Sequence, residues 1–114
     1  MINVYMDDYR AMPHGFTLAR TTEECLLLLR DCEVRVLSLD YDMGAADYSG
    51  GEVARRIVLE GLYPREIYLH TSSPWGRKEM YETLYAAVPA GVVLHNGPMS
   101  SGKLQEIARG EQTE

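Results

Sequence analysis

Positive charge is in short supply in this 114-residue chain, where 11 Lys and Arg residues stand against 17 Asp and Glu residues. The formal net charge is −6. Because nucleic-acid-binding modules usually carry a basic stripe, this balance argues against binding to an extended nucleic-acid duplex. It still allows a small nucleotide, or one nucleic-acid end, to be held in a local pocket.

Long hydrophobic runs are also lacking. No apolar run reaches the roughly 18–20 residues that a membrane span needs, and the start of the chain does not resemble a secretory signal. The two cysteines, Cys25 and Cys32, fall on one expected helix, too far apart for a disulfide between them. We therefore expect free, mostly buried thiols in a cytoplasmic protein that makes no membrane contact.

Repeats, linkers and low-complexity segments are absent from the sequence. We expect a single domain over residues 1–110 and a disordered tail over residues 111–114. Short apolar segments alternate with amphipathic ones. They predict strands over residues 2–6, 16–19, 34–39, 66–69 and 91–94, with a helix after each of the last four.

Local signals mark where the helices begin and end. Thr21 with Glu24, and Ser49 with Glu52, form two candidate capping boxes. In a capping box the hydroxyl of the first residue accepts the backbone N–H of the acidic residue, whose side chain accepts the backbone N–H of the first. Gly61 is a plausible helix stop. Four further residues bear on the helices: Cys25 and Cys32 are expected to face the core, Pro74 suits a first helical turn, and Ala108 belongs to the last helix.

The order of these elements predicts an α/β fold, a three-layer flavodoxin-like sandwich with a five-stranded parallel sheet in the strand order 2-1-3-4-5. A helix is missing between the first two strands, because Pro13 and Gly15 break that segment. A loop is expected to replace it.

Acidic side chains close two of the expected strands. Asp7 and Asp8 follow the first strand, and Asp40 follows the third. In the predicted order these strands are neighbours, and ligands of open α/β sheets bind at the carboxyl ends of strands. Mg²⁺ prefers a few carboxylates together with water and a substrate phosphate, so we expect these residues to bind Mg²⁺ or Mn²⁺. The alternative is that each aspartate only caps its own turn.

At these positions the chain resembles the receiver domain of two-component signalling. The resemblance implies that Asp7 and Asp8 bind a metal and that Asp40 is the phosphoacceptor, followed by the usual methionine, Met43. Three further positions match in the same way: Asp42 falls where a backbone carbonyl reaches the metal, and Thr71 or Ser72 matches the hydroxyl residue that senses the phosphoryl group.

Two departures separate the chain from that family. Receivers have a lysine at the end of the fifth strand, whereas this chain has Leu94-His95-Asn96-Gly97-Pro98, and the nearest lysine is Lys103. The first helix is absent. Two histidines, His70 and His95, also follow the fourth and fifth strands, where a receiver needs no imidazole.

A narrower resemblance fits these departures. The stretches Asp7–Arg10, Leu39–Gly44 and His70–Arg77 look like the cyclic-phosphate processing receiver-like domains. The resemblance implies action on a cyclic-phosphate nucleotide or RNA terminus, in a setting that includes a nucleic-acid repair enzyme as a partner.

Opening a cyclic phosphate requires an attacking water, charge stabilisation and a proton for the leaving oxygen. We expect Asp40 to be catalytic, His70 to be the first candidate for a proton donor that titrates near neutrality, and His95 to be the second. Either histidine could instead be structural.

Substrate contacts are expected from Arg10 and Arg77, whose guanidinium groups suit phosphate oxygens, and from the hydroxyls of Thr71 and Ser72. The leading hypothesis is a divalent-metal-dependent phosphoesterase. The alternatives are a signalling receiver phosphorylated on Asp40, and a non-catalytic binding module on a degenerate receiver scaffold.

Overall fold

A single parallel sheet organises the chain, as a computed structural model of residues 1–110 shows. The strand order is β2-β1-β3-β4-β5, as predicted, and the strands are β1 (Ile2–Met6), β2 (Thr17–Ala19), β3 (Val34–Leu39), β4 (Glu66–Leu69) and β5 (Val93–Leu94). The helices are α1 (Thr22–Asp31), α2 (Gly50–Glu60), α3 (Pro74–Tyr85) and α4 (Ser101–Ala108). The expected tail, residues 111–114, lies outside the described residues.

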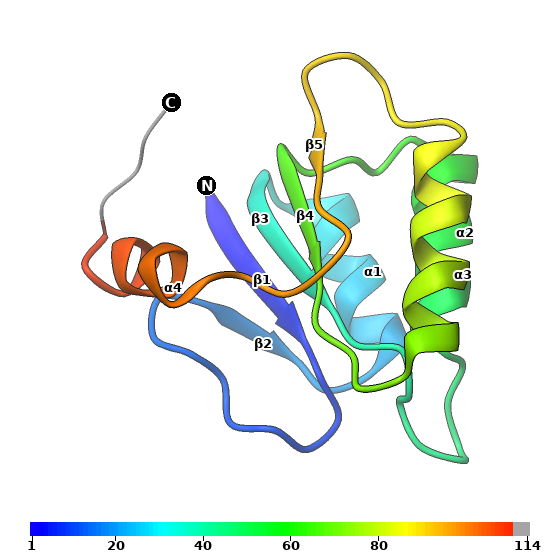
Figure 1. Cartoon of the computed structure of the whole chain (residues 1–114), viewed down its shortest axis with the longest axis horizontal. Helices are drawn as coiled ribbons and strands as arrows, with labels where there is room; N and C mark the ends of the chain where they lie inside the picture. The colour runs from blue at the N-terminus through cyan, green and yellow to red at the C-terminus, as the bar shows by residue number, and fades with distance from the viewer. Residues whose placement is uncertain (111–114) are drawn as a thin grey trace.

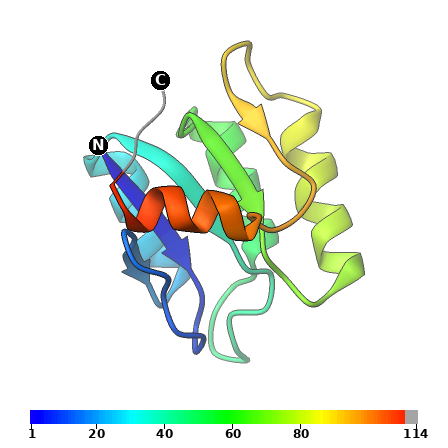
Figure 2. The ribbon, with the colours of Figure 1, turned by 60° about the vertical axis from the view of Figure 1, so that its left-hand side comes forward.

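The four helices cover the sheet unequally. α1, α2 and α3 lie on one face, and α4 alone lies across the other (Figure 1; Figure 2). The crossovers from β2 to β3, β3 to β4 and β4 to β5 all step in one direction, so right-handed connections place their helices on the same face. The step from β1 to β2 runs the opposite way. Its helix would belong on the α4 face, and the predicted loop takes its place.

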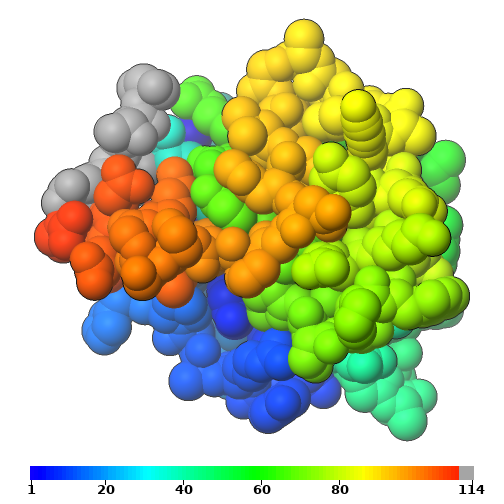
Figure 3. Space-filling view, in the orientation of Figure 1, coloured from blue at the N-terminus to red at the C-terminus, as the bar shows by residue number. Residues whose placement is uncertain are grey.

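Two apolar clusters pack against the sheet. The larger one lies between the sheet and α1–α3 and contains the fully buried Val4, Leu37, Ile57 and Leu84. The smaller one lies under α4 and contains Tyr5, Phe16, Val36, Tyr68, Met99 and Ile107. Figure 3 shows α4 and the segment before it as an orange band across this face, above the blue loop that follows β1. β3 is covered on both faces, which explains its nearly continuous apolar sequence.

The helix-start predictions are confirmed in part. Thr21 caps α1 by accepting the Glu24 N–H at 3.1 Å, but Glu24 accepts the N–H of Arg20 rather than that of Thr21. Ser49 caps α2 by accepting the Gly51 N–H. Its predicted partner, Glu52, bonds Arg55 instead, so the second capping box is not formed. Gly61 ends α2 in the left-handed region, at φ 69°, as expected.

Three boundaries and burials differ from the predictions. β2 begins at Thr17 because Phe16 turns into the smaller core. β5 begins at Val93 because Gly91 has a φ of 93° and the Val92 N–H closes a turn on Pro89. Cys32 is exposed, since it lies at the end of α1 rather than on its buried face, whereas Cys25 is buried as expected.

Within residues 1–110, none of the helices combines the length and the hydrophobicity that crossing a lipid bilayer would require.

Candidate metal and phosphate site

The strand register brings the acidic residues to one edge of the sheet. β1, β3 and β4 end level with one another, because Met6 pairs with Leu39 and Leu39 pairs with Leu69. The next residues of β1 and β3, Asp7 and Asp40, therefore lie side by side. The Asp40 N–H continues the ladder by donating to the Met6 carbonyl at 3.1 Å.

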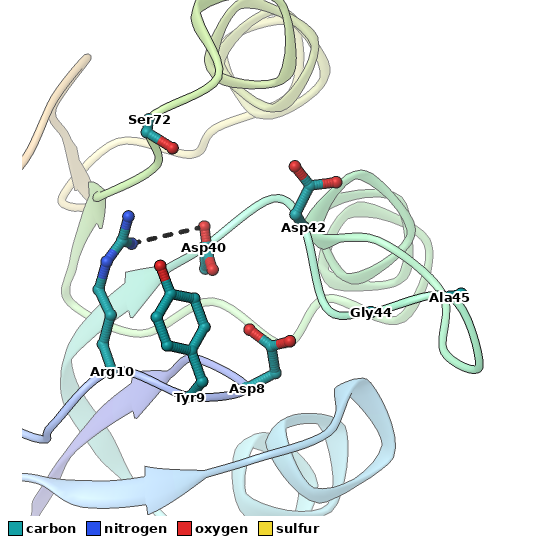
Figure 4. Close-up of a pocket in the computed structure, with 8 residues that line it drawn as sticks. All are labelled: Asp8, Tyr9, Arg10, Asp40, Asp42, Gly44, Ala45 and Ser72. Carbon is teal, nitrogen blue, oxygen red and sulfur yellow. Dashed lines mark ion pairs between the residues drawn. The ribbon is translucent and has the colours of Figure 1, made fainter.

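Three carboxylates converge at this edge. Asp7, Asp8 and Asp40 each offer an oxygen within 4.8 Å of the others, as the predicted metal site requires. A pocket of about 420 Å³ opens beside them, and Figure 4 shows its lining side chains, which are Asp8, Tyr9, Arg10, Asp40, Asp42, Gly44, Ala45 and Ser72. The main spatial prediction from the sequence is thus confirmed.

Asp7 is buried, and hydrogen bonds occupy both of its oxygens. Oδ1 accepts the N–H groups of Tyr9 and Arg10 at 3.1 and 2.9 Å. Oδ2 accepts from the Arg10 guanidinium at 3.2 Å and from His70 Nε2 at 3.1 Å. A carboxylate offers about four lone-pair positions, so these four bonds fill them. Asp7 therefore supplies negative charge and holds the loop after β1.

Asp40 has a different environment. Its Oδ1 accepts the Tyr41 N–H at 2.8 Å and lies 3.8 Å from the Arg10 guanidinium. Burial and the nearby charge of Asp7 raise the pKa of Asp40 to about 6, although the Tyr41 bond and the Arg10 charge lower it. The pKa of Asp7 is lowered instead: burial would raise it, but the backbone bonds from Arg10 and Tyr9 and the contact with His70 outweigh burial.

His70 lies at the site, but not as the titrating acid that was expected. Its Nδ1 lies 2.6 Å from the Ser38 hydroxyl, and its ring stacks on Tyr5 at 4.1 Å between centroids. Burial lowers the pKa of His70 to about 4, despite the opposing effect of Asp7. Since an ionised Asp7 only accepts, Nε2 carries the proton of the neutral ring. A general acid works best when its pKa lies near the operating pH, so this lowered pKa does not support the expected role of His70 as a proton donor near neutrality.

Arg10 is the cation of the site. Its guanidinium contacts Asp7, approaches Asp40 and donates to the His70 carbonyl at 3.2 Å. It follows β1, whereas the receiver lysine follows the fifth strand. Lys103 cannot serve in this place, because its ammonium pairs with Glu66 at 3.1 Å on the α4 side of the sheet. The positive charge next to Asp40 therefore comes from the loop after β1, and in the sheet β1 and β5 lie on opposite sides of β3.

Arg20 is a site-supporting residue that the sequence reasoning missed. Its guanidinium donates to the backbone carbonyls of Asp7 and Arg10 at 3.2 and 2.9 Å. Asn3 adds a bond to the Gly15 carbonyl. These contacts fasten the loop that replaces the first helix. The burial of Ser38 within an apolar strand is the other missed feature, and its polar side chain in that run was the available signal.

His95 does not reach the acidic cluster. β5 pairs Leu94 with Ile67, which places His95 level with Tyr68 rather than at the strand ends. Its ring stacks on Tyr68 at 4.0 Å, and its Nε2 lies 2.9 Å from the Glu66 carboxylate. The prediction that His95 acts as a second proton donor in the crevice is wrong, because the register of β5 places its ring against Tyr68 and Glu66, and it lines neither hollow at the site.

Of the remaining predicted residues, Thr71, Ser72 and Asp42 lie at the site, and Arg77 does not line it. Thr71 hydrogen-bonds Asp40, and Ser72 lines the pocket. An adjoining hollow of about 290 Å³ also includes both hydroxyl residues and Arg10. Asp42 lines the pocket, but its carboxylate is not part of the group of three. Among the described residues, the lining of neither hollow includes Arg77.

Comparison with known families agrees with this geometry. The sequence matches the cyclic-phosphate processing receiver domain over residues 2–86, which is well over half of the chain. The chain belongs to this family. The matched region contains the acidic cluster, Arg10 and His70, whereas β5 and α4 follow it. No curated protein matches the chain significantly.

Proposed function

We propose that this receiver domain is a divalent-metal-dependent phosphoesterase that opens a cyclic phosphate carried by a nucleotide or an RNA terminus. The observation that carries the proposal is the convergence of Asp7, Asp8 and Asp40 beside Arg10 in an open pocket. Membership of a family tied to cyclic-phosphate processing supports the choice of substrate class.

The chemistry of the donors fits a hard divalent cation. Clustered carboxylates repel one another, and the raised pKa of Asp40 records that repulsion together with burial. Asp8 and Asp40, which line the pocket, would hold the ion, and the buried Asp7, whose oxygens already accept four hydrogen bonds, would add negative charge beside it. Gly44 leaves room next to Asp8, since a Cβ there would lie 3.5 Å from Asp8 Oδ2. A bound ion supplies Lewis-acid stabilisation and an activated water.

The other polar groups suit phosphate binding. Arg10 can donate to phosphoryl oxygens while its contact with Asp7 keeps the guanidinium in place. Ser72 is exposed in the pocket and offers a hydroxyl donor. His70 acts as a positioning residue, because its neutral ring bridges Ser38 and Asp7.

The proposal is tested by incubating the purified chain with nucleoside cyclic phosphates, with Mg²⁺ or Mn²⁺ or with a chelator, and separating the products. We expect ring opening that requires the metal. Asp40→Asn should abolish turnover, and the matched change Asp42→Asn should retain most of it, because Asp42 lies outside the carboxylate cluster.

Two results would contradict the proposal. One is a failure to open any cyclic phosphate at any metal concentration. The other is a stable acyl phosphate on Asp40 after treatment with acetyl phosphate, which would identify a signalling receiver instead.

A further inference from the structure

The pocket contains one aromatic ring that the proposed hydrolysis does not use. Tyr9 is 74% exposed and yet lines the pocket with Arg10 and Asp40. Figure 4 shows its ring projecting from the loop after β1 into the group of lining side chains. An exposed aromatic ring at a pocket wall can pack against a bound ligand while its hydroxyl stays in water.

The backbone under Tyr9 is held firmly. Its N–H donates to Asp7 Oδ1 at 3.1 Å, and Arg20 clamps the carbonyls on either side of it, those of Asp7 and Arg10. The Arg10 guanidinium also lies 5.8 Å from the centre of the Tyr9 ring. A cation near a ring face contributes a modest attraction at an exposed site. The ring is therefore presented from a fixed backbone next to the group that would bind phosphate.

We propose that Tyr9 is a stacking surface for the nucleobase of a nucleoside cyclic phosphate whose phosphate lies at Arg10 and the carboxylate cluster. The inference rests on the proposed function and deepens it by naming the substrate class. Flat bases stack on aromatic side chains largely independently of sequence, because every base has a π face.

Charge favours a mononucleotide over a longer strand. The chain has a formal net charge of −6, and three aspartates line the pocket against the single cation Arg10 among its described lining residues. Each further phosphate of an RNA strand would meet this negative surface. A nucleoside cyclic phosphate carries only one negative charge, which Arg10 would meet together with the divalent cation of the proposed function.

The test compares equilibrium binding of two slowly hydrolysed ligands in the presence of Mg²⁺. Adenosine 2′,3′-cyclic phosphorothioate carries a base, and glycerol 1,2-cyclic phosphorothioate has the same ring without one. Base stacking of about 1–3 kcal/mol corresponds to about 5- to 150-fold. We expect the wild-type chain to prefer the adenosine ligand within that range. Tyr9→Ala should remove the preference, and Tyr9→Phe should retain it.

Matched controls make the outcome specific. Tyr48 is 71% exposed but outside this pocket, so Tyr48→Ala should leave both affinities unchanged. Trp75, 67% exposed at the start of α3, is the other aromatic candidate. A base preference that survives Tyr9→Ala and is lost in Trp75→Ala would overturn the inference.

Other outcomes separate this inference from the proposed function. Equal wild-type affinity for the two ligands would overturn the role of Tyr9 and leave hydrolysis of cyclic phosphates standing. Loss of both affinities in Tyr9→Ala would show a general effect on the site and also overturn it. Tighter binding of an RNA oligomer that ends in the same cyclic phosphorothioate would overturn the assignment of a mononucleotide as the substrate. No binding of either ligand would remove the proposed function, and this inference with it.

Discussion

At the level of single residues, the four aspartates near the pocket differ in what their oxygens contact. Asp7 is saturated by four hydrogen bonds, and Asp40 accepts a backbone N–H. Among the described residues, no hydrogen bond reaches the side chain of Asp8, which lies at the pocket wall. Asp42 is exposed at the rim. The four aspartate side chains are chemically identical, but their different contacts give them different roles.

Asp40 should weaken the metal-free fold when it is ionised. The pKa of Asp40 is raised from 3.8 to about 6 in the folded state. Between pH 3.8 and about 6, the folded state therefore keeps a proton on this carboxyl that the unfolded state has lost. Stability therefore falls as pH rises from about 4 through about 6. One pKa unit corresponds to about 1.4 kcal/mol, so the change corresponds to about 3 kcal/mol. With chelator present, Asp40→Asn should raise the free energy of unfolding at pH 8 by up to this amount.

Urea titrations at several pH values measure this effect. The difference between Asp40→Asn and the wild type should shrink as the pH is lowered from 6 to 4. A difference that does not depend on pH would show that the substitution acts through packing.

The two cysteines should differ in reactivity. Cys25 is fully buried, and burial raises the pKa of its thiol to about 12, whereas Cys32 is exposed. Because the thiolate is the reactive form, iodoacetamide at pH 8 should modify one thiol of the folded chain and both in denaturant. Mass spectrometry counts the adducts. Cys32→Ser should leave no reactive thiol in the folded state, and rapid labelling of that variant would refute the assignment.

At the level of elements, the start of α2 approaches the end of β3 very closely. The Gly50 N–H donates to the Tyr41 carbonyl at 2.8 Å, and a Cβ on Gly50 would overlap the Asp40 carbonyl oxygen. This contact links the helix to the residue after β3 that carries a site carboxylate. Glycine is required at this position by backbone approach, since no positive φ is involved.

Gly50→Ala should therefore lower the free energy of unfolding by about 1–3 kcal/mol, as overpacking does elsewhere. Gly102 in α4 is the matched control, because a Cβ there would meet only Ser100 Oγ, at 3.9 Å. Gly102→Ala should raise stability by at most about 0.5 kcal/mol, because Gly102 lies in the first turn of α4 rather than in the helix interior to which the full difference in propensity applies. Denaturant unfolding of both variants checks the pair. Equal effects of the two substitutions would mean that the contact at Asp40 is loose.

At the level of the whole molecule, the fold concentrates acidic side chains at one edge of a sheet in an already acidic protein. Three helices lie on one face of the sheet and α4 on the other (Figure 1), and a pocket opens at this edge beside the carboxylates. A cation that binds here binds only the folded state, because the carboxylates come from two strands that are separated in the sequence.

Mg²⁺ should accordingly stabilise the chain. Ligand binding at about 100 times the dissociation constant adds about 2.7 kcal/mol to the free energy of unfolding. Thermal unfolding with Mg²⁺, compared with NaCl of equal ionic strength, measures the effect. Asp8→Asn should remove the Mg²⁺ dependence, and Asp42→Asn should retain it. A shift of the same size in NaCl would indicate general screening of the acidic surface.

Sequence patterns by themselves determined the element order and the missing helix, and together with the flavodoxin-like strand order they predicted the meeting of Asp7, Asp8 and Asp40. These follow from local signals: apolar runs show where strands end, and the handedness of crossovers limits how they are ordered. Side-chain states depended on the tertiary structure. The pKa of His70 depends on its burial among Tyr5 of β1, Ser38 of β3 and Asp7, which directly follows β1. Whether His95 reaches the site is decided by the register of β5 against β4. Such contacts join distant parts of the chain, and no local pattern encodes them.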